Sequence, residues 1–354
     1  MLIFVFSQKQ FDNQSIISYN IPIVRKKVCT FMWKDKMFWK NKKFWYGVIG
    51  TIIALSLIII LCAGNYLVTY ALYVDEQGHI GSMGSDVYTG IQDSDAQVAY
   101  DNWVKNIEVE EWTITSNDDL KLSAQFYKNP KSTHRYVLAL HGYTVDHRDI
   151  MPAAYRFAEK EFHILAPDQR GRGNSEGNYL GMGWLEKDDV KIWIDKILAQ
   201  DEQAEIVLYG ESMGAATLMM SVGEALPDNV KLLIEDCGYT SAYGMFKAQL
   251  KERFHLPSFP FLPIADMISS IRAGYSFSSA DALKQLEKAT LPILFIHGDA
   301  DDYVPTEMGV ELYEAYTGEK ELLLIEGAGH GASSDVDPNM YYEHIFAFID
   351  TYMK

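Results

Sequence analysis

The stretch 206-IVLYGESMGAATLMM-220 decides the fold. An apolar run typical of a buried strand leads through Gly210-Glu211-Ser212-Met213-Gly214 into small residues that can open a helix. A G-x-S-x-G sequence between a strand and a helix is typical of a nucleophile elbow, in which the glycines permit a crowded turn and the serine Oγ is exposed. The helix N-terminus adds amide donors and a positive dipole end. The pattern therefore predicts Ser212 as a nucleophile at the end of a strand.

The elbow belongs to a series of short apolar runs that alternate with helical patterns. Near-continuous apolar runs are typical of strands in a parallel sheet. Between them, the segment 188–198 places Val190, Trp193, Ile194 and Ile197 on one helical stripe. The alternation predicts a doubly wound α/β fold, and because no helix separates the first two runs, we expect an antiparallel start. The predicted strands are 111–115, 122–127, 136–142, 162–168, 205–210, 231–236, 292–298 and 321–327.

A serine nucleophile requires a base and an orienting carboxylate, and two later strand ends offer them. His330 lies in the glycine-rich loop 327-GAGHG-331 after the last predicted strand, which makes it the best base among nine histidines. The preceding strand ends in 297-HGDADDYVP-305, which supplies three aspartates. We predict Asp301 as the acid, with Asp302 as the reserve.

An oxyanion hole needs two amide donors beside the serine. The residue after the nucleophile supplies one, which predicts Met213. The loop that follows 136–142 supplies the other, where Gly142 lets the backbone turn and Tyr143 is the predicted donor. We expect His141 to hold this loop by hydrogen bonding.

These motifs resemble the α/β-hydrolase superfamily, because "HGY", "APDQRGRGNSEG", "GESMG", "HGDADDYVP" and "GAGH" occur in that order. The resemblance covers roughly Trp112 to Lys354 and is closest to bacterial serine hydrolases of the esterase and acyl-aminoacyl-peptidase-like branch. It implies an α/β-hydrolase fold with a mostly parallel eight-stranded sheet, helices on both faces and a small cap insertion. It also implies acyl transfer to serine, with Asp168 and Arg170 holding a loop together. Glu211 departs from the histidine that often precedes the nucleophile.

Composition limits the other classes of function. The net charge is −17, and residues 1–43 contain nine Lys or Arg and two acids. Subtracting this local +7 leaves −24 on the remainder. A body so acidic disfavours nucleic-acid binding, which requires Lys and Arg to neutralise phosphates. The three cysteines form no C-x-x-C pair, so we expect no metal site, and no motif predicts a cofactor.

An apolar segment precedes the predicted enzyme. No charged residue occurs between Phe44 and Val74, a length that can cross about 30 Å of hydrocarbon as a helix. We expect a basic cytoplasmic tail at 1–43, a transmembrane helix at 44–73, a linker at 74–110 and the hydrolase domain at 111–354. The basic cluster keeps the N-terminus in the cytoplasm by the positive-inside rule, so the domain faces outward. A cleaved signal peptide is the alternative, with weak candidate sites such as Leu61-Cys62-Ala63.

The segment at about 240–289 is the largest insertion before the acid-bearing strand, and we expect it to form the cap. Its apolar residues favour an apolar acyl or aromatic group, although ordinary packing of helices on the sheet explains them equally well. The predicted activity is hydrolysis of carboxylic esters. An aminopeptidase or amidase with the same triad, and a non-catalytic hydrolase-like surface binding module, are the alternatives. The predicted partners are a small ester or short peptide substrate and, through the N-terminal helix, a membrane.

Overall fold

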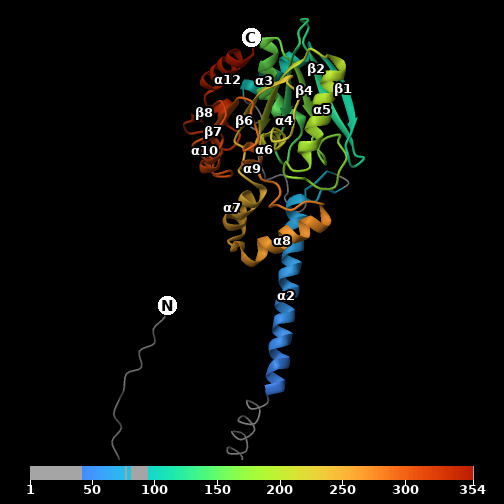
Figure 1. Ribbon diagram of the computed structural model, residues 1–354, viewed down its shortest axis with the longest axis vertical. Coiled ribbons are helices and arrows are strands. Elements are labelled where there is room, and N and C mark those ends of the chain that lie inside the picture. The colour runs from blue at the N-terminus through green and yellow to red at the C-terminus, as the bar shows by residue number, and fades with distance from the viewer. Residues whose placement is uncertain (1–41, 76–77, 81–94, 354) are drawn as a thin grey trace, which may run out of the picture. The chain divides into compact units, whose positions relative to one another are not determined.

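The computed structural model describes residues 42–75, 78–80 and 95–353, so most of the predicted tail lies outside the described residues. The body contains one eight-stranded sheet with helices against both faces (Figure 1). The strands are β1 Glu108–Thr115, β2 Lys121–Lys128, β3 Arg135–Leu140, β4 His163–Pro167, β5 Glu205–Glu211, β6 Val230–Asp236, β7 Ile293–Gly298 and β8 Lys320–Ile325.

The strand order is β1-β2-β4-β3-β5-β6-β7-β8. β2 pairs antiparallel with both β1 and β4, whereas all the remaining pairs are parallel. β4 and β7 are buried along their whole length, which explains why they read as unbroken apolar runs. The predicted mostly parallel sheet with an antiparallel start is therefore confirmed.

Two hydrophobic cores lie on the two faces of the sheet, because successive side chains of a strand point to opposite faces. On β3, for example, Leu138 packs in one core and Val137 in the other. α5, α6, α7, α9 and α10 contribute to the Leu138 core, and α3, α4 and α12 contribute to the Val137 core. The helices of the body are α3 Asp95–Val104, α4 His147–Ala154, η1 Tyr155–Lys160 (a 3₁₀ helix), α5 Glu186–Gln200, α6 Met213–Ser221, α7 Ala242–Phe254, α8 Ser258–Arg272, α9 Ala282–Leu286, α10 Thr306–Ala315, α11 Ser333–Val336 and α12 Pro338–Tyr352.

The stripe predicted on 188–198 lies in α5, where all four of its apolar residues are buried. The predicted cap segment between β6 and β7 contains α7, α8 and α9. In contrast, the segment 74–110, expected to be a linker, is partly structured. α3 packs against the body through Tyr100 and Trp103, whose rings contact Tyr155. These aromatic side chains give α3 an apolar surface, which the Gly- and Ser-rich stretch before it had obscured.

Helix α2 spans Lys42–Leu72, and the chain divides into two compact units at Ile58 and Ile59. The described part of the first unit is residues 42–58 of α2. By length and composition alone, α2 is apolar enough to cross a membrane, a test that a signal sequence also passes. Large aliphatic side chains along it, such as Ile52 and Ile59, are exposed.

The second unit begins within α2, and the last turns of this helix pack against α8 (Figure 1). A Cβ at Gly64 would lie 2.7 Å from Ile264 Cγ2, so only glycine permits this close approach. Arg272 Nη1 donates hydrogen bonds to Asn65 Oδ1 at 2.8 Å and to Thr69 Oγ1 at 2.7 Å. The helix predicted to lie wholly in a membrane therefore ends inside the packed body, because its last turns have apolar and polar partners there.

Candidate active site

The elbow at Ser212 is a sharp turn between β5 and α6. Ser212 has φ 55° and ψ −116°, a strained conformation for a residue with a Cβ. Its N–H donates to Asp236 O at 2.8 Å, which ties the turn to the neighbouring strand β6. A Cβ at Gly214 would lie 2.1 Å from Leu140 O, so the turn can only pack against β3 with glycine at this position.

Ser212, His330 and Asp301 form a continuous hydrogen-bonded chain. His330 Nε2 lies 2.8 Å from Ser212 Oγ, and His330 Nδ1 lies 2.7 Å from Asp301 Oδ2. Both distances fit hydrogen bonds if Nδ1 carries the proton and Nε2 accepts the serine hydroxyl. The ring of Tyr303 packs against the imidazole, with ring centroids 4.9 Å apart. The three residues predicted as nucleophile, base and acid thus lie in the order that proton transfer from serine requires.

Asp301 is held from two directions. Its Oδ1 accepts the N–H groups of Tyr303 and Val304, each at 2.9 Å. Burial acts to raise the pKa of Asp301, but hydrogen bonds from His297, His330 and the Val304 N–H outweigh it and hold this pKa well below its usual range. The carboxylate is therefore ionised at neutral pH. The loop turns the Asp301 carboxylate toward His330, whereas the reserve candidate Asp302 is exposed.

A buried histidine that the sequence did not single out, His297, also contacts Asp301. His297 Nε2 is 3.3 Å from Asp301 Oδ2 and 3.0 Å from Val304 O. The side chain of Glu235 on β6 is also fully buried, and burial raises its pKa to about 8. Among the described residues, His297 Nδ1 and Glu235 Oε1 are buried atoms with no hydrogen-bond partner. The sequence does contain a signal for His297, because this histidine is the first residue of the H-G-x-x-D pattern whose last residue is Asp301.

The loop after β3 lies directly against the nucleophile. A Cβ at Gly142 would lie 3.6 Å from Ser212 Cβ, which brings the Gly142-Tyr143 backbone to the serine. His141 fixes this loop, as expected: its Nδ1 bonds to Gly142 O at 2.7 Å and its Nε2 accepts the Gln169 N–H at 3.0 Å. Burial lowers the pKa of His141 to about 4, so its ring is neutral. The predicted donors Tyr143 and Met213 thus flank Ser212 from the β3 loop and from the first residue of α6.

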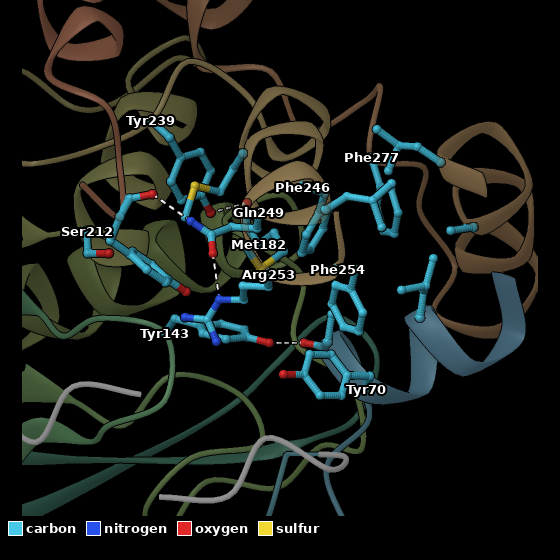
Figure 2. Close-up of a pocket in the computed structure, with 17 residues that line it drawn as sticks. Tyr70, Tyr143, Met182, Ser212, Tyr239, Phe246, Gln249, Arg253, Phe254 and Phe277 are labelled. Carbon is cyan, nitrogen blue, oxygen red and sulfur yellow. Dashed lines mark hydrogen bonds between the residues drawn. The ribbon is translucent and has the colours of Figure 1, made fainter. Parts of the chain in front are cut away.

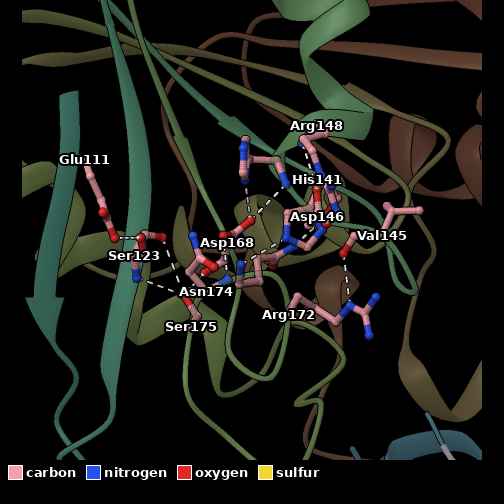
Figure 3. A network of polar contacts seen from close by, with 12 residues as sticks. Glu111, Ser123, His141, Val145, Asp146, Arg148, Asp168, Arg172, Asn174 and Ser175 are labelled. Carbon is pink, nitrogen blue, oxygen red and sulfur yellow. Dashed lines mark hydrogen bonds and ion pairs between the residues drawn. The ribbon is translucent and has the colours of Figure 1, made fainter. Parts of the chain in front are cut away.

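The loop after β4 is held by a polar network around Asp168 (Figure 3). Asp168 Oδ2 accepts the Asn174 N–H at 2.9 Å, and Asp168 Oδ1 lies 2.7 Å from His147 Nδ1. Arg172 donates to Val145 O at 3.0 Å, which connects this loop to the one after β3. Arg170 joins this loop to α5 through a bidentate ion pair with Asp189. Together these contacts brace the backbone that carries the predicted oxyanion donor.

Several carboxyl groups lie near the elbow. Glu211 lines a polar pocket together with Ser212, His330 and Asp149. Burial raises the pKa of Glu211 well above its usual value, and the charges of Asp236 and Asp149 add to this effect. Burial likewise raises the pKa of Asp149 to about 6. Glu211 therefore faces the site and favours its protonated form, in contrast to Asp301.

Ser212 also lines a second, apolar pocket (Figure 2). We call the two spaces the polar pocket and the apolar pocket. Both are lined by Ser212, Tyr143, Arg253 and Tyr303, so they meet at the nucleophile. The polar pocket is completed by Gly142, Thr144, Val145, Asp149, Glu211, Asp302 and His330. The remaining residues of the apolar pocket are Leu67, Tyr70, Ala71, Met182, Tyr239, Met245, Phe246, Gln249, Leu250, Phe254, Leu262, Ala265 and Phe277.

Two groups of side chains in the described part of the chain have ligand atoms close enough to hold a metal ion. One is Cys237 with Asp301 and His330, and the other is Asp146 with His147 and Asp168. The first contains the Asp301–His330 pair that contacts Ser212, and the second belongs to the loop network.

Comparison with known proteins finds similar sequences and similar structures. Residues 131–237, which include β3 to β6 and the elbow, match a family model described as Serine aminopeptidase. The protein YqkD of Bacillus subtilis is 29% identical over 226 residues, which are 64% of this chain and 74% of that protein. The esterase Pf2001 of Pyrococcus furiosus superposes with a TM-score of 0.58 at 23% identity, covering 70% of this chain and 94% of the esterase.

The matched family segment contains the elbow, and the structural match covers nearly all of the esterase chain. The chain has the α/β-hydrolase fold. A further structural neighbour is the acylaminoacyl peptidase of Pyrococcus horikoshii, with a TM-score of 0.56 and 16% identity over 72% of this chain and 43% of the peptidase. The structural neighbours thus include both an esterase and a peptidase, and what they share with this chain is the fold.

Proposed function

We propose that this α/β hydrolase is a serine esterase that cleaves carboxylic esters through an acyl-enzyme on Ser212. The observation that carries the proposal is the hydrogen-bonded chain from Ser212 Oγ through His330 to Asp301, with distances of 2.8 and 2.7 Å. The strained elbow supports it, because backbone strain is retained where the surrounding structure enforces it and clusters at functional sites.

In the proposed reaction, Ser212 Oγ attacks the ester carbonyl carbon while His330 Nε2 takes the hydroxyl proton. Asp301 stabilises the imidazolium, and the amides of Tyr143 and Met213 receive the negative charge on the carbonyl oxygen. The C–O bond then breaks, and His330 gives its proton to the departing alcohol. Water, deprotonated by His330, attacks the acyl-enzyme, which releases the carboxylic acid and restores Ser212.

The second candidate is an aminopeptidase or amidase that uses the same three residues. The observation in its favour is the carboxyl lining of the polar pocket, where Asp149 and Asp302 offer a site for the ammonium group of a peptide N-terminus. An esterase has no need for such a group. Aminoacyl-p-nitroanilides and matched aminoacyl esters distinguish the two candidates by their values of kcat/KM.

We also propose that α2 anchors the enzyme, with the basic N-terminal residues in the cytoplasm and the hydrolase domain outside. The support is the apolar surface of α2 together with the basic cluster that precedes it. A C-terminal alkaline phosphatase fusion, which is active only outside the cytoplasm, tests the orientation. An inactive phosphatase fusion with a fluorescent cytoplasmic reporter fusion at the same site contradicts it.

The experiment for the catalytic proposal uses the full chain in detergent. Wild-type protein is expected to react with a fluorophosphonate probe and to hydrolyse p-nitrophenyl butyrate. Ser212→Ala removes the nucleophile, and losing a triad member lowers kcat by about 10⁴ to 10⁶. Unchanged thermal unfolding of the variant shows that the fold is intact. Hydrolysis that survives the substitution contradicts the assignment, and a folded wild type that the probe fails to label favours a non-catalytic binding module.

A further inference from the structure

The wall of the apolar pocket includes the last turns of α2. Leu67, Tyr70 and Ala71 line this pocket together with Ser212 (Figure 2). The Tyr70 ring packs edge to face on Phe254 of α7, with centroids 5.3 Å apart. The Tyr143 hydroxyl donates a hydrogen bond to the Ala71 carbonyl. The helix end is therefore joined both to the cap and to the loop that carries the predicted oxyanion donor.

The rest of the lining is suited to a hydrocarbon chain. Of the 17 lining residues, those with polar side chains other than tyrosines are Ser212, Gln249 and Arg253. Arg253 Nε donates a 2.7 Å hydrogen bond to Gln249 Oε1, and Gln249 Nε2 donates to Tyr303 O at 2.8 Å. Burial of apolar surface is thus the main attraction that the pocket offers a ligand.

The sequence connects this pocket to the proposed anchor. Leu67 follows the uncharged, aliphatic segment of the same helix that we propose crosses the membrane. In the sequence, the pocket-lining residues of α2 follow directly on this segment. An acyl chain that leaves the bilayer along α2 meets Leu67, Tyr70 and Ala71 before it reaches Ser212.

We propose that the last turns of α2 are a substrate-binding element and that the apolar pocket takes the fatty-acyl chain of an ester lipid from the bilayer. This inference rests on the proposed esterase function and on the proposed anchor. It adds the substrate class, a long-chain acyl ester, and it assigns chain-length preference to side chains of the anchor helix. The reacting carbonyl lies at Ser212, and the alcohol leaves through the polar pocket.

The first test narrows the pocket from the helix side. Leu67→Trp places a larger side chain in the lining, whereas Leu61→Trp makes the same change at an exposed position of α2 that does not line the pocket. The full chain in detergent is assayed with p-nitrophenyl palmitate and p-nitrophenyl butyrate. We expect Leu67→Trp to lower the palmitate-to-butyrate ratio of kcat/KM about tenfold, the effect of excluding roughly two methylene groups. We expect Leu61→Trp to leave the ratio unchanged.

The outcomes separate this inference from the proposed function. If the wild type neither hydrolyses p-nitrophenyl butyrate nor reacts with a fluorophosphonate, the esterase proposal fails. If it does both, and Leu67→Trp and Leu61→Trp give the same ratio, the esterase proposal stands and the role of α2 in the pocket is wrong. Ala71→Leu, a smaller intrusion into the same wall, provides a second variant if Leu67→Trp does not fold.

The second test identifies where the acyl chain comes from. Full-length protein in phosphatidylcholine vesicles is given 1-palmitoylglycerol either in the same bilayer or in separate vesicles that contain no protein. We expect hydrolysis in the same bilayer to be at least about tenfold faster, because the ester then reaches α2 by diffusion within the membrane. Equal initial rates in the two arrangements overturn the bilayer source and indicate uptake from solution.

Discussion

Replacing the acid provides the sharpest test of the site, because the surroundings of Asp301 fix the outcome of Asp301→Asn. Oδ1 accepts two backbone N–H groups, from Tyr303 and Val304, each at 2.9 Å. The side-chain oxygen of the new amide must keep that position, since an NH₂ group there would oppose two donors. The amide NH₂ therefore replaces Oδ2 and points toward His330 Nδ1, 2.7 Å away in the wild type.

The consequence is a change in the tautomer of His330. An amide donor requires Nδ1 to accept, so the proton moves to Nε2, the atom that lies 2.8 Å from Ser212 Oγ. Nε2 can then no longer remove the serine proton. In a Ser-His-Asp site this change lowers kcat by about 10⁴, which corresponds to about 5.5 kcal/mol of transition-state stabilisation.

The assay is steady-state hydrolysis of p-nitrophenyl butyrate at neutral pH by the full chain, with fluorophosphonate labelling as a second readout. Asp302→Asn is the matched control, because its carboxylate is exposed and one residue away. We expect the control to stay within a few-fold of the wild type. A 10⁴-fold loss in Asp302→Asn with an active Asp301→Asn would refute the reasoning, and a full loss in both would show that the loop tolerates neither change.

Two further predictions concern the buried pair behind the acid. Burial raises the pKa of Glu235 to about 8 from 4.5, so the folded state holds a proton that the unfolded state releases, and stability falls as pH rises through this window. Thermal unfolding at a series of pH values is expected to show that Glu235→Gln loses less unfolding free energy than the wild type as pH rises. The two slopes are expected to differ by up to about 1.4 kcal/mol per pH unit. The same pH dependence of stability in both proteins contradicts this prediction. His297 Nε2 lies 3.3 Å from Asp301 Oδ2 and helps to hold this carboxylate in place. His297→Phe removes the contact and is expected to lower kcat about tenfold, because the Asp301 carboxylate is then less well positioned. His297→Gln, which keeps a hydrogen-bond donor, is expected to restore much of the lost activity. The pH profile of kcat/KM checks this second prediction, because a purely structural defect would lower the profile without shifting its acid limb.

Local patterns were sufficient for the elements of the fold. All eight strands overlap the predicted apolar runs, and the runs are nearly continuous in β4 and β7 because these strands are buried along their whole length. The stripe on 188–198 became α5 for the same reason, since its four apolar residues had to face a sheet. In contrast, α3 was hidden, because a few aromatic residues after a Gly- and Ser-rich stretch do not make a periodic pattern long enough to recognise.

The sequence signals for the candidate site residues differ in strength. Ser212 and His330 each follow a strand in a glycine-rich turn, and parallel strands bring their carboxyl ends to one edge of the sheet. The sequence ranked Asp301 first and left Asp302 as the reserve, because which of two adjacent carboxylates turns inward depends on tertiary contacts such as the N–H groups of Tyr303 and Val304. His297 was overlooked because its role depends on burial, which a single histidine in a strand does not reveal.

The sequence by itself determined the class of sheet, the nucleophile elbow and the apolar helix, because each is encoded by residues that are adjacent or periodic along the chain. Only the tertiary structure decided which carboxylate meets His330, that Glu211 faces the site, and that the end of α2 contributes Leu67, Tyr70 and Ala71 to the apolar pocket. The physical reason is that these features arise from contacts between segments far apart in the chain. Hydrophobicity can place a helix in a membrane or in a core, and only the partners that it meets show that α2 also ends beside Ser212.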